Sequence, residues 1–232
     1  WLRTSHTHGM LLAQTRDDAV GEAFDKGASL LGLPYPGGPV LAQLAAGGDQ
    51  STFPFPLPLQ NHDTLDFSFS GLKTALRYTI RDVGDEWELH KKDLAASYEH
   101  ALCAHLIDRV LRCMNEHPEI QEVHIVGGVS ANRHLRELLG EICTQHHLIL
   151  RVPKKLEYCT DNAAMIASAG YCMLQERQEE ACTTFTTEAH IPLKDFLVPK
   201  NLSRKRREQS THQNSESPKQ GNSTNDCTFC FG

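Results

Sequence analysis

The sequence predicts a fold of the α/β class, in which helices alternate with short parallel strands. The first observation is the order of hydrophobic patterns between residues 91 and 176, which predicts helix, strand, helix, strand and helix. The second is the glycine pair Gly127-Gly128, which stands where a strand pattern changes to a helical one. Strand, turn and helix in this order are typical of units that build parallel sheets.

Length and composition are those of an ordinary globular protein. The chain has 232 residues, 40% of them hydrophobic, which allows one large domain or two small ones with a core of their own. No apolar run is long enough to span a membrane and no segment resembles a signal peptide, so we expect no membrane partner. The chain begins with Trp1 rather than Met, which indicates a fragment, a processed product or an incomplete gene model.

The first 48 residues are expected to contain two helices after an irregular N-terminal segment. Residues 1–15 show no clear period, so we expect an atypical, unstructured N-terminal segment. Residues 16–32 combine helical spacing with carboxylates at the start, and Gly32 is suited to end that helix. A turn over residues 34–39 and a short helix over residues 40–48 follow.

The middle of the chain contains a loop and the longest predicted helix. The prolines of residues 49–63 exclude a central strand and predict a loop. Alternating apolar residues predict a strand over residues 65–69, before a helix introduced by Gly71. Residues 91–116 show an apolar stripe at helical spacing, and His105 on that stripe is interpreted as a core histidine rather than a metal ligand.

In the last part of the chain, predicted strands and helices alternate, and a polar segment of different composition follows them. A strand before Gly127, a helix after it, a strand over residues 148–152 and a helix over residues 160–176 are predicted. Residues 200–232 are rich in Ser, Asn, Gln, Lys and Arg, so we expect a disordered polar and basic tail. The Cys227–Cys230 pair lies in that tail and has no matching second pair for zinc, and the other six cysteines suit a reducing, cytosolic environment.

Several polar residues and glycines are candidates for ligand binding. Gly127 and Gly128 follow a buried strand, where ligands approach the backbone in open α/β folds, and Asn132 can offer a donor and an acceptor. The carboxylate of Asp25 is suited to hold ribose hydroxyls, although an exposed pair with the neighbouring Lys26 is the simpler interpretation. Asp161 can act as a helix cap, a metal ligand or both.

Four motifs in one order carry a family resemblance. They are "DDAVGEAFDKGASLLGLPYPGGP", "LDFSFSGLKTAL", "VGGVSANRHLR" and "CTDNAAMIASAG". Together they closely resemble the bacterial-type TsaD family of tRNA N6-adenosine threonylcarbamoyltransferases, formerly called O-sialoglycoprotein endopeptidases. The resemblance covers about residues 16–196, and we expect a transferase domain over residues 16–199. It implies the actin-like, Hsp70-like ATPase fold with two ribonuclease-H-like lobes, of which this chain holds mostly the second.

The resemblance also implies roles for individual residues. Asp25 matches a substrate-binding aspartate at the ribose, Gly38 a substrate-contacting backbone position, and Asn132 the asparagine at the adenosine. Asp161 matches a ligand of one divalent metal ion, Fe²⁺ or Zn²⁺, with Thr160 expected as the helix cap. The family completes this metal site with two histidines in an HxxxH motif, which does not occur in this chain.

The implied reaction is acyl transfer in tRNA modification. The threonylcarbamoyl group passes from threonylcarbamoyl-AMP to N6 of the adenosine 3′ of the anticodon in tRNAs that read codons beginning with A. Implied partners are tRNA, the synthase that makes threonylcarbamoyl-AMP and accessory proteins of the pathway. The implied location is the cytoplasm, or the mitochondrion in a eukaryote.

The departures from the family lead to two further expectations. Because most of the first lobe has no counterpart here, we expect this chain alone to be inactive and to self-associate through an uncovered apolar face. The alternative is a non-catalytic relative that serves as a nucleotide- or protein-binding module.

Overall fold

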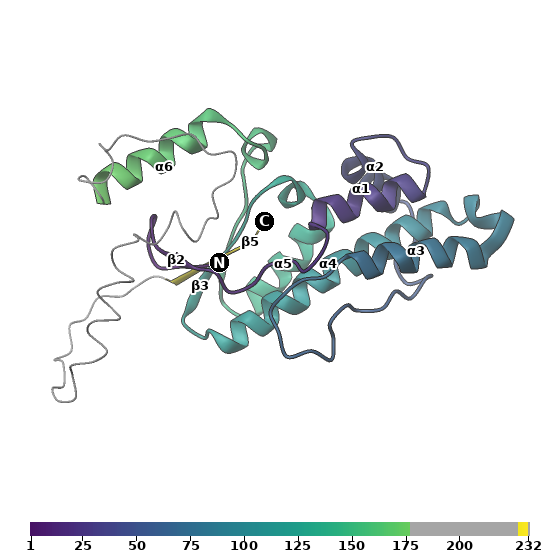
Figure 1. The fold of residues 1–232 in the computed structure, drawn as a ribbon, viewed down its shortest axis with the longest axis horizontal. Coiled ribbons are helices and arrows are strands. Elements are labelled where there is room, and N and C mark those ends of the chain that lie inside the picture. Colours follow the sequence, from purple (N-terminus) through teal and green to yellow (C-terminus); the bar gives the residue numbers. More distant parts are fainter. Residues whose placement is uncertain (177–226, 232) are drawn as a thin grey trace.

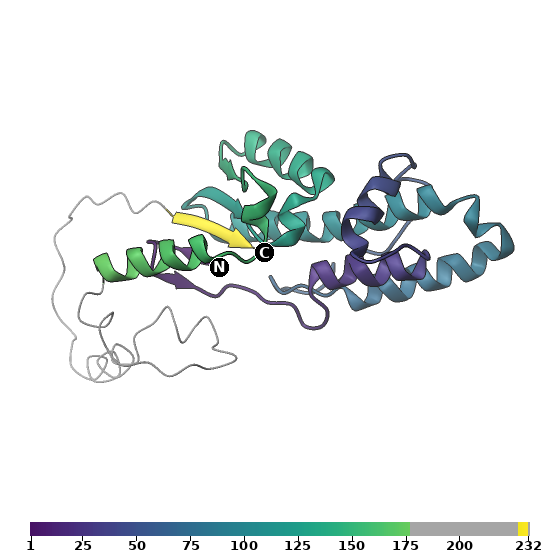
Figure 2. The same cartoon turned by 90° about the horizontal axis from the view of Figure 1, so that it is seen from above.

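Helices and a small sheet form a mixed α/β fold in the computed structural model, which describes residues 1–176 and 227–231 (Figure 1). Helices α1 to α4 gather at one end of the elongated molecule, and α5 and the sheet lie near its centre. Helix α6 lies at the opposite end, beside the N-terminal strands (Figure 2). The predicted α/β class is therefore confirmed, including parallel pairing of strands.

Four helices and one short 3-10 helix make up the helical end. They are α1 (Val20–Leu30), α2 (Gly37–Ala45), α3 (Ser70–Val83), the 3-10 helix η1 (Gly84–Glu88) and α4 (Lys91–Glu116). The bounds of α4 are those predicted from its apolar stripe. Helix α1 starts later than predicted because the Thr15 hydroxyl donates to the Asp18 carbonyl at 2.7 Å and holds a turn there. Gly32 has φ of 66° just beyond α1, which confirms its role in ending that helix.

Helix α4 is the centre of the apolar core. It packs against α1, α2, α3 and α5. Its buried residues include Leu94, Tyr98, Leu102, Leu106 and Val110, and the core also takes side chains from the surrounding helices and β3. Burying these apolar side chains removes them from water, which is the main favourable contribution to folding.

The proline-rich segment between α2 and α3 is a loop, as predicted, and arginines of α4 hold it. The guanidinium of Arg109 is almost fully buried and donates to the carbonyls of Leu59, at 3.0 Å, and Thr64. Next along α4, Arg112 donates to the carbonyl of Gln60 at 2.8 Å. Backbone carbonyls of an otherwise irregular segment thereby gain hydrogen-bond partners.

The sheet has five strands in the order β2-β1-β5-β3-β4. Its strands are β1 (Leu2–Arg3), β2 (Gly9–Met10), β3 (Ile120–Ile125), β4 (Ile149–Arg151) and β5 (Cys227–Phe231). Strand β3 pairs in parallel with both β4 and β5, and Val123 aligns with Leu150 on one side. Helix α5 (Arg133–Gln145) connects β3 to β4, as the sequence predicts.

Three predictions about where strands form were wrong. Residues 1–15 contain the antiparallel pair β1–β2, which is stabilised by pairing of β1 with β5 from the other end of the chain. Residues 65–69 form one isolated bridge, between Phe67 and Thr15, rather than a strand, because among the described residues their pairing partner is a single residue. Residues 227–231 form β5, since their Thr, Phe and Cys residues are suited to strands. The rest of the predicted tail, 200–226 and 232, lies outside the described residues.

Helix α6 (Ala163–Glu176) has no buried residue within the described part of the chain. It begins three residues after Thr160, and its N-terminal cap is Asn162, whose Oδ1 accepts from the Met165 amide at 3.0 Å. The expectation of a Thr160 cap is therefore wrong, because the amide side chain of Asn162 reaches the helix amide instead. Among the described residues, no helix has the length and apolar character needed to cross a membrane.

Candidate functional site

Asp25 and Gly38 are brought together by the packing of α1 against α2. Oδ1 of Asp25 accepts a hydrogen bond from the backbone N–H of Gly38 at 3.0 Å. Close packing makes this contact possible, because a Cβ on Gly37 would lie 2.6 Å from the Cβ of Ala28. Oδ2 of Asp25 has no hydrogen-bond partner among the described residues and is free to accept from a ligand hydroxyl.

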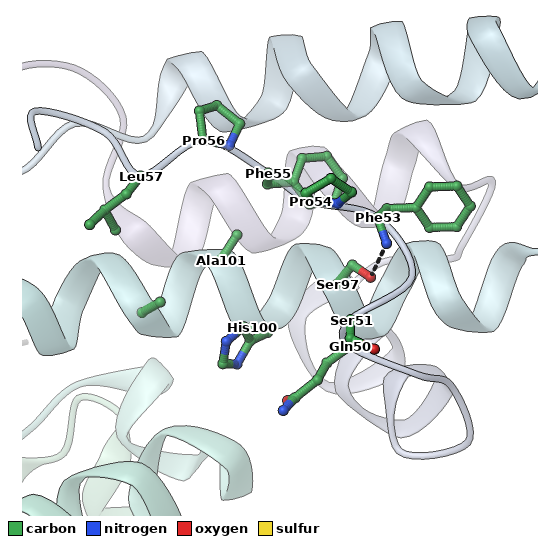
Figure 3. A pocket seen from close by; sticks show the side chains of 11 residues that line it. Gln50, Ser51, Phe53, Pro54, Phe55, Pro56, Leu57, Ser97, His100 and Ala101 are labelled. Atoms are coloured by element: carbon green, nitrogen blue, oxygen red, sulfur yellow. Dashed lines mark hydrogen bonds between the residues drawn. The ribbon is translucent and has the colours of Figure 1, made fainter.

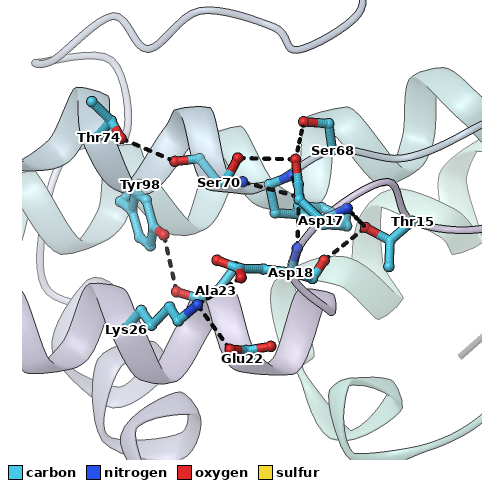
Figure 4. Close-up of polar contacts among 11 residues, drawn as sticks. Thr15, Asp17, Asp18, Glu22, Ala23, Lys26, Ser68, Ser70, Thr74 and Tyr98 are labelled. Atoms are coloured by element: carbon cyan, nitrogen blue, oxygen red, sulfur yellow. Dashed lines mark hydrogen bonds and ion pairs between the residues drawn. The ribbon is translucent and has the colours of Figure 1, made fainter.

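The exposed pair between Asp25 and Lys26, which was the alternative interpretation, does not form. Lys26 instead pairs with Asp18 at 2.6 Å and with Glu22 at 2.8 Å (Figure 4). These two carboxylates raise the pKa of Lys26 by hydrogen bonding. The carboxylate of Asp25 therefore has no ion pair with Lys26, and it accepts its hydrogen bond from the backbone of α2.

The glycine pair forms a turn directly after β3. Gly127 has φ of 76°, a left-handed conformation that favours glycine, and the 3-10 helix η2 (Gly128–Ala131) follows it. Both glycines are exposed, and a Cβ added to Gly128 would meet no atom within 4 Å. The sequence therefore located a turn whose backbone is open to an approaching ligand.

Asn132 is the N-terminal cap of α5. Its Oδ1 accepts from the Leu135 amide at 2.8 Å, and its Nδ2 donates to Oε1 of Glu99 at 2.6 Å. One lone pair and one amide hydrogen remain on the side chain, so a ligand can use them without breaking either bond. Burial raises the pKa of Glu99, although its hydrogen bond from Asn132 opposes the shift.

The two halves of the candidate site meet across α1 and α4. A Cβ on Gly21, near the start of α1, would lie 3.6 Å from a methyl group of Val129 in η2. On α4, Tyr98 donates to the carbonyl of Ala23 at 2.9 Å, while its neighbour Glu99 holds Asn132. Adjacent residues of one helix thus anchor the segment that contains Asp25 and the segment that contains Asn132.

Asp161 is exposed and, within the described residues, forms no hydrogen bond or ion pair with the other candidate residues. It follows the 3-10 helix η3 (Leu156–Cys159), which packs against η2. No group of three or more His, Cys, Asp and Glu side chains within the described residues is placed to hold a metal ion. The described residues therefore do not form a complete metal site, and Asp161 is the single candidate ligand that the resemblance gives among them.

A second polar feature lies beside the proline-rich loop. Nδ1 of His100 on α4 lies 3.1 Å from Nε2 of His134 on α5, and burial lowers the pKa of both rings. His100 also borders a cavity of about 430 Å³ that is lined mainly by apolar residues of the loop, including Phe53 and Phe55 (Figure 3). This cavity does not include any of the predicted site residues.

Sequence reasoning did not find Glu99, the His100–His134 pair or Arg136. Glu99 and His100 contact residues 33 and 34 positions away, and Arg136 reaches Pro153, which is 17 positions away. Helical periodicity shows that Glu99 and His100 lie on α4, but it does not show which other helix faces them. Only the tertiary packing supplies that information.

The comparisons with known proteins decide the family. The family model for tRNA N6-adenosine threonylcarbamoyltransferase, TsaD, matches residues 5–168. The chain belongs to the TsaD family. The matched range includes all six predicted site residues, and it confirms the resemblance based on the four motifs.

Curated relatives with the name tRNA N6-adenosine threonylcarbamoyltransferase match more than two thirds of the chain. One from Polaromonas naphthalenivorans is 47% identical over 165 residues, which are 71% of this chain and 46% of the relative. One from Brucella ovis is 48% identical over 165 residues, or 68% of this chain and 46% of the relative. One from a Chelativorans species is 44% identical over 194 residues, which are 81% of this chain and 53% of the relative. The chain spans about half the length of the curated relatives it matches.

Proposed function

We propose that this TsaD-family chain takes part in the transfer of a threonylcarbamoyl group from threonylcarbamoyl-AMP to N6 of a tRNA adenosine. The adenosine is the one 3′ of the anticodon in tRNAs that read codons beginning with A. The observation that supports this most directly is the family match over residues 5–168, which contains every predicted substrate-binding residue. The elements described here would then belong to the second lobe of an actin-like fold.

Each candidate residue has a defined part in holding the adenylate. The free oxygen of Asp25 accepts from ribose hydroxyls, and the Gly37–Gly38 backbone keeps that carboxylate in place. The turn at Gly127-Gly128 admits the adenosine to the backbone, and the remaining amide groups of Asn132 bind it. Positioning of this kind brings the carbamoyl carbon and the attacking amine into contact.

Asp161 is the residue that we propose as a ligand of the family's divalent metal. When bound, such an ion offsets negative charge on phosphate and acyl oxygens. Asp161 alone would not hold the ion tightly, because no group of three or more ligating side chains is placed around a common point in the described residues. The HxxxH histidines do not occur in this chain, so we propose that it is inactive alone.

Other proteins are proposed to contribute to tRNA binding. The chain has a net charge of −6, whereas tRNA phosphates are bound mainly by Lys and Arg. The synthase that produces threonylcarbamoyl-AMP and accessory proteins of the pathway are the proposed partners. The reaction would take place where tRNA is modified, in the cytoplasm or the mitochondrion.

Calorimetric titration with AMP tests the proposed nucleotide site. Gly128→Val adds a branched side chain where a Cβ meets open space, so it should block the ligand without disturbing the turn. We expect AMP affinity to fall about tenfold or more, a loss of about 1.4 kcal/mol. Gly71→Val in α3 is the matched control, since a Cβ there also meets nothing within 4 Å. Equal AMP binding by the parent and Gly128→Val would place the nucleotide elsewhere.

A further inference from the structure

Arg136 of α5 connects three segments that are separated in the sequence. Its Nε donates to the carbonyl of Ser130 in η2. Its Nη2 lies 3.4 Å from the carbonyl of Pro153, which follows β4, and 3.9 Å from Sγ of Cys159 in η3. One half-buried guanidinium therefore contacts the segments on both sides of the candidate site.

The contact with Ser130 extends to the glycine turn. The backbone N–H and the hydroxyl of Ser130 both donate to the carbonyl of Gly127, at 3.1 and 2.6 Å. Ser130 itself is buried. By binding the Ser130 carbonyl, Arg136 fixes the residue that closes the turn at Gly127-Gly128.

The contacts with Pro153 and Cys159 extend to the other segment. Cys159 is buried and lies two residues before the exposed Asp161. Since η2 packs against η3, Arg136 joins two elements that already touch. The guanidinium thus contacts both the chain that leads to Asp161 and the residue that closes the glycine turn.

The guanidinium group is suited to this task and has no competing partner. It is planar and has five N–H donors in a fixed arrangement, so it can bind several carbonyl groups at once. Arg136 forms no ion pair within the described part of the chain, in contrast to Arg133 on the same helix, which pairs with Glu137 at 2.7 Å. The donors of Arg136 are therefore directed to backbone and sulfur acceptors of the site segments.

We propose that Arg136 is a positioning residue of the nucleotide site, which holds the Gly127-Gly128 turn and residues 153–161 in a fixed relative position. Its effect on ligand affinity rests on the proposed function. Its effect on the position of the two segments rests on the contacts alone. The effect on affinity and the effect on the segments can therefore be tested separately.

Hydrogen exchange followed by mass spectrometry tests the structural part in the full chain. In Arg136→Ala, amides of residues 127–132 and 155–162 should exchange faster together, while α4 stays protected. Arg136→Lys keeps the charge but lacks the planar arrangement of donors, so it should protect one of the two segments at most. Arg133→Ala, on the exposed side of the same helix, is the matched control and should leave both segments unchanged.

Chemical rescue tests the positioning role. AMP affinity should fall about tenfold in Arg136→Ala, as expected for the loss of a charged hydrogen-bond donor. Millimolar methylguanidinium should restore AMP affinity and amide protection in this variant and leave Arg133→Ala unaffected. A purely structural role in the helix would show no rescue, because the additive cannot repair helix packing.

The outcomes separate this proposal from the proposed function. Unchanged exchange in either segment of Arg136→Ala, or faster exchange throughout the chain in both Arg136 variants, overturns the positioning role. Absence of AMP binding by the parent chain contradicts the proposed nucleotide site, whereas exchange still decides the role of Arg136. Loss of protection in both segments with rescue by methylguanidinium supports the proposal.

Discussion

Asp17 caps a helix that begins more than fifty residues later in the chain, through the backbone N–H of Phe69. Its Oδ1 accepts from that N–H at 2.7 Å and from the Ser70 N–H at 3.2 Å. Its Oδ2 accepts from the hydroxyls of Ser68, at 2.6 Å, and Ser70, at 2.9 Å (Figure 4). A carboxylate at this position satisfies the free amides at the start of α3 and fastens it to the segment before α1.

The capping contact should make stability fall in acid. Burial raises the pKa of Asp17, but the hydrogen bonds from Phe69, Ser68 and Ser70 outweigh it and lower the pKa to about 2. Because the folded pKa is depressed, this contribution is fully present above the ordinary value of 3.8 and is lost as pH falls towards 2. Asp17→Asn should cost about 1 kcal/mol at pH 7, because an amide nitrogen in place of Oδ2 cannot accept from the two serine hydroxyls. Urea unfolding should show this difference between parent and variant shrinking below pH 4, and a difference independent of pH would contradict the assignment.

Local patterns predicted the helices well because each pattern lies within one element. The apolar stripe of α4 gave its bounds, and the Gly127-Gly128 pair gave the turn after β3. The strand pairing of residues 2–3 with 228–229 was not predictable, since it joins opposite ends of the chain. The same reason explains the missed contact between Glu99 and Asn132. The motifs supplied the candidate site residues, and the tertiary packing supplied their partners.

Gly27 is expected to be irreplaceable because the ring of Tyr98 lies against it. A Cβ at position 27 would lie 2.9 Å from Cδ1 of Tyr98 and closer still to Cε1. Gly27→Ala should therefore destabilise the chain by about 1–3 kcal/mol through overpacking. Gly140→Ala, inside α5 and with open space around it, is the control and should be neutral or stabilising.

A double-mutant cycle by thermal unfolding checks this explanation. The cost of Gly27→Ala should shrink when Tyr98→Leu is also present, because the smaller side chain removes the clash. An equal cost in both backgrounds would show that the effect arises from the backbone of α1 rather than from Tyr98.

Glu99→Gln is expected to stabilise the chain at neutral pH. Burial raises the pKa of Glu99, which means that the buried, ionised form is disfavoured. Glutamine keeps an oxygen to accept from Asn132 Nδ2 and removes the charge. The melting temperature at pH 7 should rise by about 2–4 °C, the shift expected for ~1 kcal/mol in a chain of this size.

The pH dependence of the stability difference between Glu99→Gln and the parent checks the direction of the pKa shift of Glu99. A carboxyl with a raised folded pKa stabilises the fold while protonated and loses this contribution as pH rises above its ordinary value of 4.5. The advantage of the variant should therefore be largest at neutral pH and smallest near pH 4. Asn132→Ala in the same experiment should destabilise the chain, since it removes the cap of α5.

Helix α6 leads us to expect self-association of the isolated chain. Ile166 is 76% exposed and Tyr171 is 65% exposed, and Met165 and Leu174 are also exposed among the described residues. Apolar side chains exposed on one helix in this way favour contact with another copy in water. Sedimentation velocity over a range of concentrations should show the parent chain associating and Ile166→Glu shifting it towards monomer, because a charge in such a contact must be desolvated. Leu89→Glu, at a residue that is 80% exposed but lies outside α6, should not change the association. A parent chain that stays monomeric at every concentration, or an equal effect of both variants, would show that α6 is not the contact.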